Sequence, residues 1–514
     1  MQGNERDNVH DWLHYHSQYN ASDLAVVDLE TARHWTYAQF NERATRLATG
    51  LHQVYGVAKG DRVAILAHNS SDIFECLFAC WKLGAIFTPL NWRLAPPEIA
   101  HLVAHAAPKL IFYDREFESL VRDVDGVKIM REPMSGGGAY EQLIASHEPD
   151  VLMNGVGMDD VHAILYTSGT TGRPKGVMYT HRMTFYTVVQ SALHADLNRT
   201  SRTLTFSPLF HTAGLNAAAL SLFHHGGTLY IMKRWDAAKA LAYFSDPELG
   251  ITHVNGVPTT YIMMSELPEF ETASFPTIKF FGVGSAPISM DLLETWKRKG
   301  ADLAQSYGMT EVFGVSLTPP HRAAQMIGSA GHPMMHVDVR IADESGMELP
   351  RGEVGEIQVR GPGVTPGYWR EPELTKAAFI DGWLKTGDLA RMDDSGALFI
   401  VDRLKDMYIS GGENVYPSEI ENVISAFEEV SQVAVIEVPH PKWGEVGLAL
   451  ILLRAGQRLD QDTVLARCRE NLAAYKVPKH ISFVKALPLN AQGKVLKKDL
   501  RREYAAFTGT TKNQ

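Results

Sequence analysis

The segment Tyr166-Thr-Ser-Gly-Thr-Thr-Gly-Arg-Pro-Lys-Gly176 follows directly on the apolar stretch His162-Ala-Ile-Leu-Tyr166. Its glycines allow the backbone to approach a ligand closely, and successive N–H groups in such a loop can form a nest for an anion. The serine and threonine hydroxyls add donors, and Lys175 adds a positive charge. The segment therefore predicts a phosphate-binding loop at the end of a strand.

A loop of this composition has two other readings. It is not a Walker A motif, because Gly176 stands where that motif places its magnesium-binding serine or threonine. A Ser/Thr/Gly-rich turn taken alone is most often a flexible surface loop. The complete string placed after an apolar strand favours phosphate binding over that alternative.

Around the loop, short apolar or β-branched runs alternate with helix-like stretches. Residues 62–66, 109–113 and 162–166 have the composition of strands, and residues 71–83 that of a helix. Parallel strands need long crossover connections, so this alternation favours mostly parallel sheets covered by helices. We expect an α/β fold with ligand sites at the carboxyl ends of its strands.

The pattern changes after about residue 340. Gly- and Asp-rich turns at 343–346 and 393–396 predict hairpins. Beyond Asp402 the chain is typical of a compact α+β unit, with a helix that begins near Pro417, strands at 433–438 and 448–453, and helices at about 461–474 and 495–506. We therefore expect one domain over residues 1–402 and a second over 403–514.

Composition excludes several classes of protein. The 514 residues include 49 Lys+Arg and 59 Asp+Glu, a net charge of −10 that excludes a generally basic nucleic-acid binder. Three cysteines are too few for a disulfide framework and lack the spacing of a structural zinc site. The N-terminus lacks the apolar run of a signal peptide, and the apolar stretch 204–232 is too often interrupted to span a bilayer. A reducing, cytoplasmic setting is expected.

Further motifs follow the phosphate loop in a fixed order. They are Gly282-Val-Gly-Ser-Ala-Pro287, Tyr307-Gly-Met-Thr-Glu311, Thr386-Gly-Asp388, Asp402-Arg-Leu-Lys-Asp-Met-Tyr-Ile-Ser-Gly-Gly-Glu-Asn-Val-Tyr-Pro417 and Gly493-Lys494. In this order, over nearly the whole chain, they resemble the adenylate-forming superfamily of acyl-CoA synthetases, aryl-CoA ligases, luciferases and peptide-synthetase adenylation domains. The resemblance implies a large N-terminal domain of mostly parallel sheets with helices and a distorted β-barrel part, followed by a small mobile α+β domain.

The resemblance also implies where ATP binds. Tyr307 offers an aromatic face for adenine, Asp388 and Arg403 hold the ribose, Thr310 contacts the phosphates, and Glu311 binds Mg²⁺, a cation that prefers carboxylate oxygen. Taken alone, Asp388 would be read as a turn-capping residue. The full expected set of cofactor-binding residues, for ATP and CoA together, comprises Thr167, Ser168, Gly169, Thr170, Thr171, Gly172, Lys175, Gly284, Ser285, Ala286, Pro287, Ser306, Tyr307, Gly308, Met309, Asp388, Arg403, Gly411 and Gly412.

Lys494 matches the lysine that the small domain of this superfamily brings into the active site. There its charge would stabilise the meeting of the acid's carboxylate with the α-phosphate. A lone loop lysine is otherwise usually solvated. In the second half-reaction the small domain of similar enzymes rotates about a residue that matches Lys405. This rotation moves the strand Ser410-Gly-Gly412 over the pantetheine tunnel, where Gly412 leaves room for the thiol arm of CoA.

The resemblance places the acid in a mostly apolar pocket lined from residues 210–216, 255–258, 281–284 and 312–314. No aspartate is evident there to pair an α-amino group, which disfavours amino acids. His211 is expected to gate or orient the substrate. We expect an AMP-forming acyl-CoA synthetase, with fatty acids as the leading substrates and coumarate- or ferulate-like aryl acids as the alternative.

Two other classes of function remain open at this stage. The adenylate could be passed to a carrier protein or another nucleophile, or the chain could be a catalytically silent nucleotide-binding protein. The expected small-molecule partners are a carboxylic acid, ATP with Mg²⁺, and CoA, without nucleic acid, and a homodimer is left open. The basic cluster of Lys497, Lys498, Arg501 and Arg502 is interpreted as a solvated helix face, with weak peripheral membrane association as the alternative.

Overall fold

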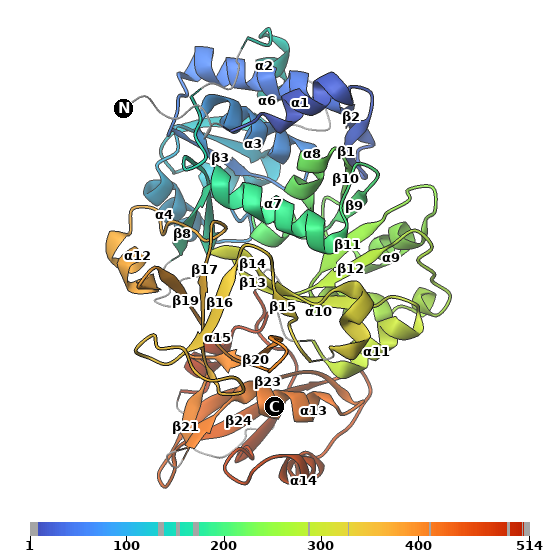
Figure 1. Cartoon of the computed structure of the whole chain (residues 1–514), viewed down its shortest axis with the longest axis vertical. Helices are drawn as coiled ribbons and strands as arrows, with labels where there is room; N and C mark the ends of the chain where they lie inside the picture. The colour runs from blue at the N-terminus through green and yellow to red at the C-terminus, as the bar shows by residue number, and fades with distance from the viewer. Residues whose placement is uncertain are drawn as a thin grey trace.

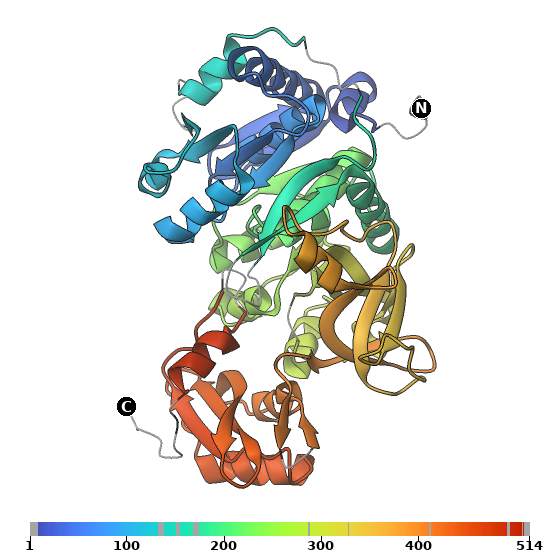
Figure 2. The ribbon, with the colours of Figure 1, turned by 90° about the vertical axis from the view of Figure 1, so that its left-hand side faces the viewer.

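A computed structural model describes residues 9–131, 138–150, 155–167, 174–285, 288–326, 328–410, 413–490, 494–505 and 507. The described chain is elongated, with its C-terminal part at one end of the long axis (Figure 1 and Figure 2). Its strands form four sheets, three of them built from residues before 404. The expected α/β class is therefore confirmed.

The phosphate loop joins two strands of a six-stranded sheet whose order is β6-β5-β3-β4-β7-β8. These strands are β3 (Arg62–Leu66), β4 (Ile86–Pro89), β5 (Leu110–Asp114), β6 (Val127–Arg131), β7 (Val161–Thr167) and β8 (Lys175–Thr180). All neighbours pair in parallel except β7 and β8, which are antiparallel at one edge. Thr167 lies opposite Lys175 in this pair, so both ends of the loop are fixed by the sheet.

A nine-stranded sheet supplies the other wall of the site, in the order β15-β14-β13-β12-β11-β9-β10-β1-β2. Its strands are β1 (Leu24–Asp28), β2 (Arg33–Thr36), β9 (Arg202–Thr205), β10 (Thr228–Ile231), β11 (His253–Gly256), β12 (Phe280–Val283), β13 (Leu303–Met309), β14 (Val312–Leu317) and β15 (His332–Pro333). In this order, neighbouring strands from β13 across to β1 pair in parallel. The antiparallel pairs lie at the two edges: β1 with β2, β13 with β14, and β14 with β15. Crossover helices account for this arrangement.

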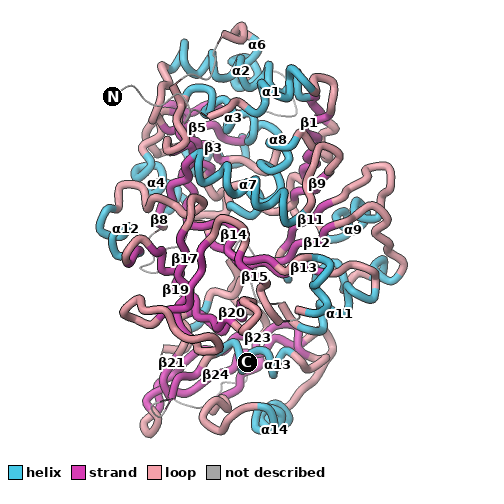
Figure 3. The backbone as a smooth tube through the Cα atoms, viewed as in Figure 1, coloured by secondary structure: helices cyan, strands magenta, loops and turns pink. Residues whose placement is uncertain are grey.

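Helices cover the two sheets (Figure 3). They include α1 (Trp12–Tyr19), α2 (Tyr37–Tyr55), α3 (Ser71–Leu83), α4 (Pro96–Ala106), α7 (His181–Ala195), α8 (Ser221–His225), α9 (Ala237–Ser245), α10 (Pro258–Ser265) and α11 (Met290–Arg298). Helix α3 has the bounds predicted from sequence and ends at Gly84, whose φ of 65° suits a residue without a side chain. Its thiols Cys76 and Cys80 are fully buried and serve as packing groups.

The predicted hairpins form a curled sheet in the order β16-β17-β19-β18, with β20 paired to β19. Its elements are β16 (Asp338–Ala342), β17 (Gly355–Arg360), α12 (Pro372–Ala378), β18 (Phe379–Ile380), β19 (Trp383–Met392) and β20 (Leu398–Arg403). This sheet corresponds to the expected distorted barrel part. Strand β20 leads directly into the C-terminal unit.

The C-terminal unit packs helices against a second small sheet. It contains β21 (Tyr408–Ser410), β22 (Glu413–Val415), α13 (Pro417–Ser425), β23 (Val430–His440), β24 (Gly444–Leu453), α14 (Gln461–Asn471), β25 (His480–Val484) and α15 (Lys497–Glu503). Helix α13 begins at Pro417 as predicted, because proline lacks the N–H that a first turn leaves unbonded. Helix α15 is shorter than the predicted 495–506.

The interpretation of the basic cluster as a solvated helix face was wrong for two of its four residues. Lys497 forms an ion pair with Glu421 at 2.7 Å with 15% of its side chain exposed. Arg501 pairs with both Asp406 and Glu437. These charges hold α15 against the rest of the C-terminal unit. Within the described ranges, no helix combines the length and apolar character that crossing a bilayer requires.

Candidate active site

A single cavity of about 1190 Å³ lies between the two large sheets, the curled sheet and the C-terminal unit. The predicted site residues that the structure describes all line it: Thr167, Lys175, His211, Gly284, Ser285, Ser306, Tyr307, Gly308, Met309, Thr310, Glu311, Asp388, Arg403 and Lys494. Ser168, Gly169, Thr170, Thr171, Gly172, Ala286, Pro287, Gly411 and Gly412 lie outside the described residues. Residues separated by more than 300 positions thus face one space.

One end of the cavity carries the phosphate-loop lysine and a buried carboxylate. Thr310 and Glu311 form the two-residue turn between β13 and β14. Glu311 is 3% exposed, and its Oε1 accepts hydrogen bonds from Lys175 Nζ at 2.6 Å and from the Tyr368 hydroxyl at 2.8 Å. Thr167 Oγ1 is buried without a partner among the described residues. This end therefore offers a cation, a carboxylate and an unused hydroxyl.

The strand register creates a second polar group. Asp388 on β19 lies directly opposite Arg403 on β20, and Arg403 Nε is 3.3 Å from Asp388 Oδ1. The Tyr307 hydroxyl donates to Asp388 Oδ2 at 2.7 Å. Burial, followed by the nearby Asp388 charge, raises the pKa of Tyr307 well above its usual value, so it stays a neutral donor. The carboxylate is held in place by two strands and one aromatic ring.

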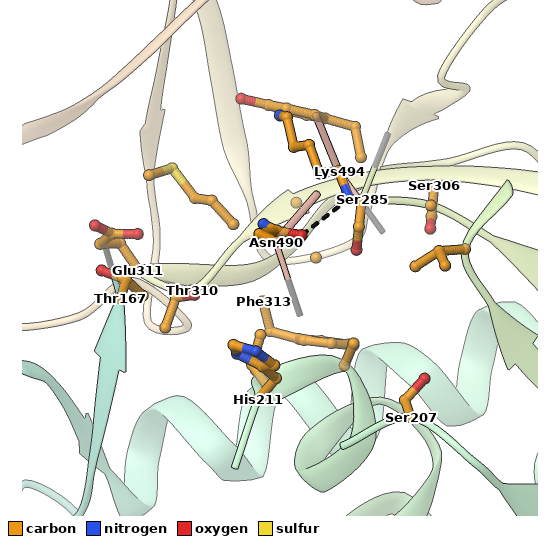
Figure 4. Close-up of a pocket in the computed structure, with 18 of the residues that line it drawn as sticks. Thr167, Ser207, His211, Ser285, Ser306, Thr310, Glu311, Phe313, Asn490 and Lys494 are labelled. Atoms are coloured by element: carbon orange, nitrogen blue, oxygen red, sulfur yellow. Dashed lines mark hydrogen bonds between the residues drawn. The ribbon is translucent and has the colours of Figure 1, made fainter. Parts of the chain in front are cut away.

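Lys494 enters the cavity from the C-terminal unit on a loop closed by Asn490. The Lys494 N–H donates to Asn490 Oδ1 at 2.9 Å (Figure 4). The Asn490 N–H donates to the Lys494 carbonyl at 2.8 Å. Burial, together with the neighbouring Arg403, lowers the pKa of Lys494 to about 8. Lys405 also lines the cavity, and burial lowers its pKa as well. Three cations thus converge near Asp388.

His211 and Phe313 both line the cavity (Figure 4). Burial, and then the charge of Arg93, lowers the pKa of His211 to about 4, so the ring is neutral at physiological pH. Its Nε2 is buried without a hydrogen-bond partner among the described residues. A neutral ring in this place can orient a substrate but cannot neutralise a carboxylate.

Sequence reasoning missed several residues of the site. Tyr368 was not predicted, although its hydroxyl contacts both Lys175 and Glu311. Ser191 on α7 and His253 on β11 line the far end of the cavity without belonging to any recognised motif. Nothing local in the sequence marks them, because their role comes from the packing of distant elements.

Comparison with protein families decides the assignment. Residues 14–369 match the family model described as AMP-binding enzyme, and residues 419–494 match the model of the AMP-binding enzyme C-terminal domain. The chain belongs to the AMP-binding enzyme family. The expected adenylate-forming relationship is thereby confirmed.

Two relatives of this AMP-binding enzyme are CoA ligases named for different acids. A feruloyl-CoA synthase of Amycolatopsis sp is 41% identical over 91% of this chain and 94% of its own length. The long-chain-fatty-acid–CoA ligase FadD13 of Mycobacterium tuberculosis is 37% identical over 94% of this chain and 95% of its own. The enzyme is an AMP-forming acid–thiol ligase that uses ATP, Mg²⁺ and CoA.

Solved structures of relatives share this fold over nearly the whole chain. ATP-bound MatB from Rhodopseudomonas palustris superposes with a TM-score of 0.89 at 32% identity, over 96% of this chain and 99% of that one. Apo MatB, also 32% identical and covering 97% of this chain and 99% of its own, gives 0.78. This chain therefore superposes more closely on the ATP-bound structure than on the apo structure.

The residues present fit a magnesium ion bound together with ATP. Among the described residues no group of three or more His, Cys, Asp or Glu could hold a metal alone. Mg²⁺ in nucleotide sites needs only one or two protein carboxylates, because phosphate oxygens and waters complete its shell. Glu311 beside the phosphate loop supplies such a carboxylate. Bound there, the ion would neutralise charge on the phosphates.

Proposed function

We propose that this AMP-binding enzyme joins a hydrophobic carboxylic acid to CoA in two half-reactions within one cavity. A carboxylate oxygen attacks the α-phosphorus of ATP, and the bond to pyrophosphate breaks. The CoA sulfur, after losing its proton, then attacks the acyl carbon, and AMP leaves. The observation that carries the proposal is that Lys494 faces the same cavity as Lys175 and Glu311.

The phosphates of ATP are assigned to the end of the cavity that carries Lys175. There Lys175 would exchange its bond to Glu311 for one to phosphate, and Thr167, Thr310 and the loop 168–172 would donate hydrogen bonds. Glu311, relieved of Lys175, would contact Mg²⁺. The exchange keeps one cation beside the buried carboxylate in both states, which avoids an unpaired buried charge.

The nucleoside of ATP is assigned to the polar group formed by Asp388, Arg403 and Tyr307. Asp388 would accept hydrogen bonds from the ribose hydroxyls, and Arg403 would donate to the same sugar. The adenine would lie on Tyr307, with segments 284–287 and 306–309 around it. Ser285 has a φ of 68°, a backbone conformation that turns the chain sharply beside this space.

Lys494 is assigned to the attack on the α-phosphorus. Two anions repel strongly in a closed site, and a cation fixed between them lowers the barrier. We place the domain boundary between residues 402 and 403, with the hinge near Lys405, so that rotation withdraws Lys494 before CoA arrives. The arrangement described here suits the first half-reaction, since Lys494 faces the cavity.

Aryl acids and fatty acids are both candidate substrates, because the two relatives differ in this respect. The function as a whole is tested by product analysis. Purified enzyme with ATP, Mg²⁺ and a panel of hydrophobic acids is expected to release AMP and form a thioester only when CoA is present in turnover amounts. AMP release that is unaffected by CoA, without any thioester, would indicate another acceptor and overturn the proposal.

A pH profile tests the charge state assigned to Lys494. The pKa of about 8 means that the lysine loses its proton as pH rises through that value. Because kcat/KM reports the free enzyme, kcat/KM for adenylation is expected to fall about tenfold per pH unit well above pH 8. In Lys494→Arg the guanidinium stays charged, so this descending limb is expected to disappear. A wild-type limb that persists in the arginine variant would refute the assignment.

A further inference from the structure

The end of the cavity away from the phosphate loop is lined mostly by apolar side chains, with the Ser191 hydroxyl of α7 among them. Phe280, Leu317 and Met334 line it, and they belong to one buried cluster that packs against Ala195 of α7. The His253 ring also lines this end, with its centroid 6.1 Å from that of Phe280. This part of the cavity suits the hydrophobic portion of an acid.

His253 brings no free polar atom to this end. Its Nε2 lies 2.7 Å from the Ala195 carbonyl, and its Nδ1 lies 2.7 Å from Thr252 Oγ1. Both nitrogens are therefore used inside the protein, and the ring acts as an aromatic wall. The ring forms part of the cavity wall and needs no hydrogen-bond partner from the substrate.

Asn255 is the next cavity-lining residue along β11. Side chains two apart on a strand share a face, which places Asn255 about 6–7 Å nearer the nucleotide end than His253. Across the sheet it pairs with Gly282, and Asn255 Oδ1 lies only 2.0 Å from the position that a side-chain carbon on Gly282 would take. The missing side chain of Gly282 thus makes room for the amide.

The Asn255 amide has no hydrogen-bond partner in the part of the chain that the structure describes. A substrate that covers the amide removes it from water. A saturated alkyl chain leaves both of its polar atoms unsatisfied, whereas an oxygen substituent can accept from the NH₂ group or donate to Oδ1. Sites with such a group strongly reject analogues that lack the matching oxygen.

The remaining walls favour a flat substrate. The Phe313 ring and the neutral His211 ring both line the cavity (Figure 4), and Gly284 and Gly314 line it with bare backbone. Aromatic faces and bare backbone pack well against a planar ring. The acid that best matches these walls and the free amide is an aromatic one.

We propose that Asn255 is a specificity-determining residue that selects aromatic acids bearing a ring hydroxyl or ether oxygen over fatty acids. The inference rests on the proposed function, since it concerns the acid that is adenylated in this cavity. It assigns the Asn255 amide as the hydrogen-bond partner of that oxygen.

The test compares acids that differ by one oxygen. For the wild-type enzyme, kcat/KM is measured by CoA-dependent AMP release with cinnamate, its three monohydroxy derivatives and dodecanoate. At least one hydroxycinnamate is expected to exceed cinnamate by about tenfold or more, and to exceed dodecanoate. In Asn255→Leu, which keeps the size of the side chain, the preference over cinnamate is expected to fall to about onefold while KM for ATP is unchanged.

Leu317→Met is the matched control, because it changes the apolar end at nearly constant volume. It is expected to affect cinnamate and hydroxycinnamate to a similar extent and leave their ratio intact. A wild-type preference for dodecanoate, or an unchanged ratio in Asn255→Leu, overturns the inference alone. The wild-type panel decides the first point even if the leucine variant does not fold. Absence of CoA-dependent AMP release with every acid overturns the proposed function and this inference with it.

Discussion

Replacing Lys494 by alanine is expected to lower the rate of acyl-adenylate formation by about 10²-fold or more, the usual loss when one preorganised charge-stabilising donor is removed. The lysine is held in the cavity by a loop with two hydrogen bonds to Asn490, so its charge is positioned before the substrates meet. The measurement is acid-dependent exchange of pyrophosphate into ATP.

The two half-reactions provide the control for this variant. Since rotation about Lys405 is proposed to withdraw Lys494 before thioester formation, Lys494→Ala should convert preformed acyl-adenylate and CoA to product within a few-fold of the wild-type rate. Asn490→Ala keeps the charge but loosens the loop, and should give an intermediate loss of exchange. Wild-type exchange in Lys494→Ala, or equal loss in both half-reactions, would contradict the role.

Much of this site could be predicted from the sequence, because its motifs lie where strands end or turn. The string 166–176 predicted a loop after an apolar strand, and β7 and β8 hold both of its ends. Asp388 and Arg403 lie in separate motifs, yet the hairpin predicted at 393–396 brings them directly opposite each other. A local sequence pattern was sufficient to predict these contacts, because in each case a single short connection joins the two strands that carry the residues.

Other parts of the site could not be predicted from any local pattern. Tyr368 reaches Glu311 only because the backbone at 365–369 bonds to the turn at 311 and to strand β8. The free amide of Asn255 depends on Gly282, a neighbour on a different strand. The solvated interpretation of Lys497 failed for the same reason, since Glu421 lies 76 positions earlier in the chain. Such contacts are set by tertiary packing.

The substrate end of the cavity shows why family membership alone leaves the acid open. The nucleotide end is built from recognised motifs, whereas the acid end is built from α7, β11, β12 and β14, whose cavity-facing residues come mostly from outside them. A change of one side chain there is therefore expected to alter the preferred acid without altering the residues that face ATP. The acid must therefore be inferred from individual contacts.

Replacing Glu311 by glutamine is expected to reduce adenylation by about 10²- to 10³-fold at ordinary Mg²⁺ concentration. The substitution keeps the shape of the side chain but removes the charge that is proposed to hold Mg²⁺. It also leaves Lys175 without its anionic partner in the free enzyme. The concentration of Mg²⁺ needed for half-maximal pyrophosphate exchange is expected to rise by about tenfold or more.

Tyr368→Phe separates the contribution of the tyrosine hydrogen bonds from that of the two charges, Lys175 and Glu311. It removes the 2.8 Å hydrogen bond to Glu311 and the 2.7 Å hydrogen bond to Lys175 while both charges remain. Because a neutral donor contributes about 1 kcal/mol, a loss of roughly fivefold is expected, with little change in the Mg²⁺ requirement. If Glu311→Gln left the Mg²⁺ requirement unchanged, or if Tyr368→Phe raised it equally, the carboxylate would be a structural partner of Lys175 and not the magnesium ligand.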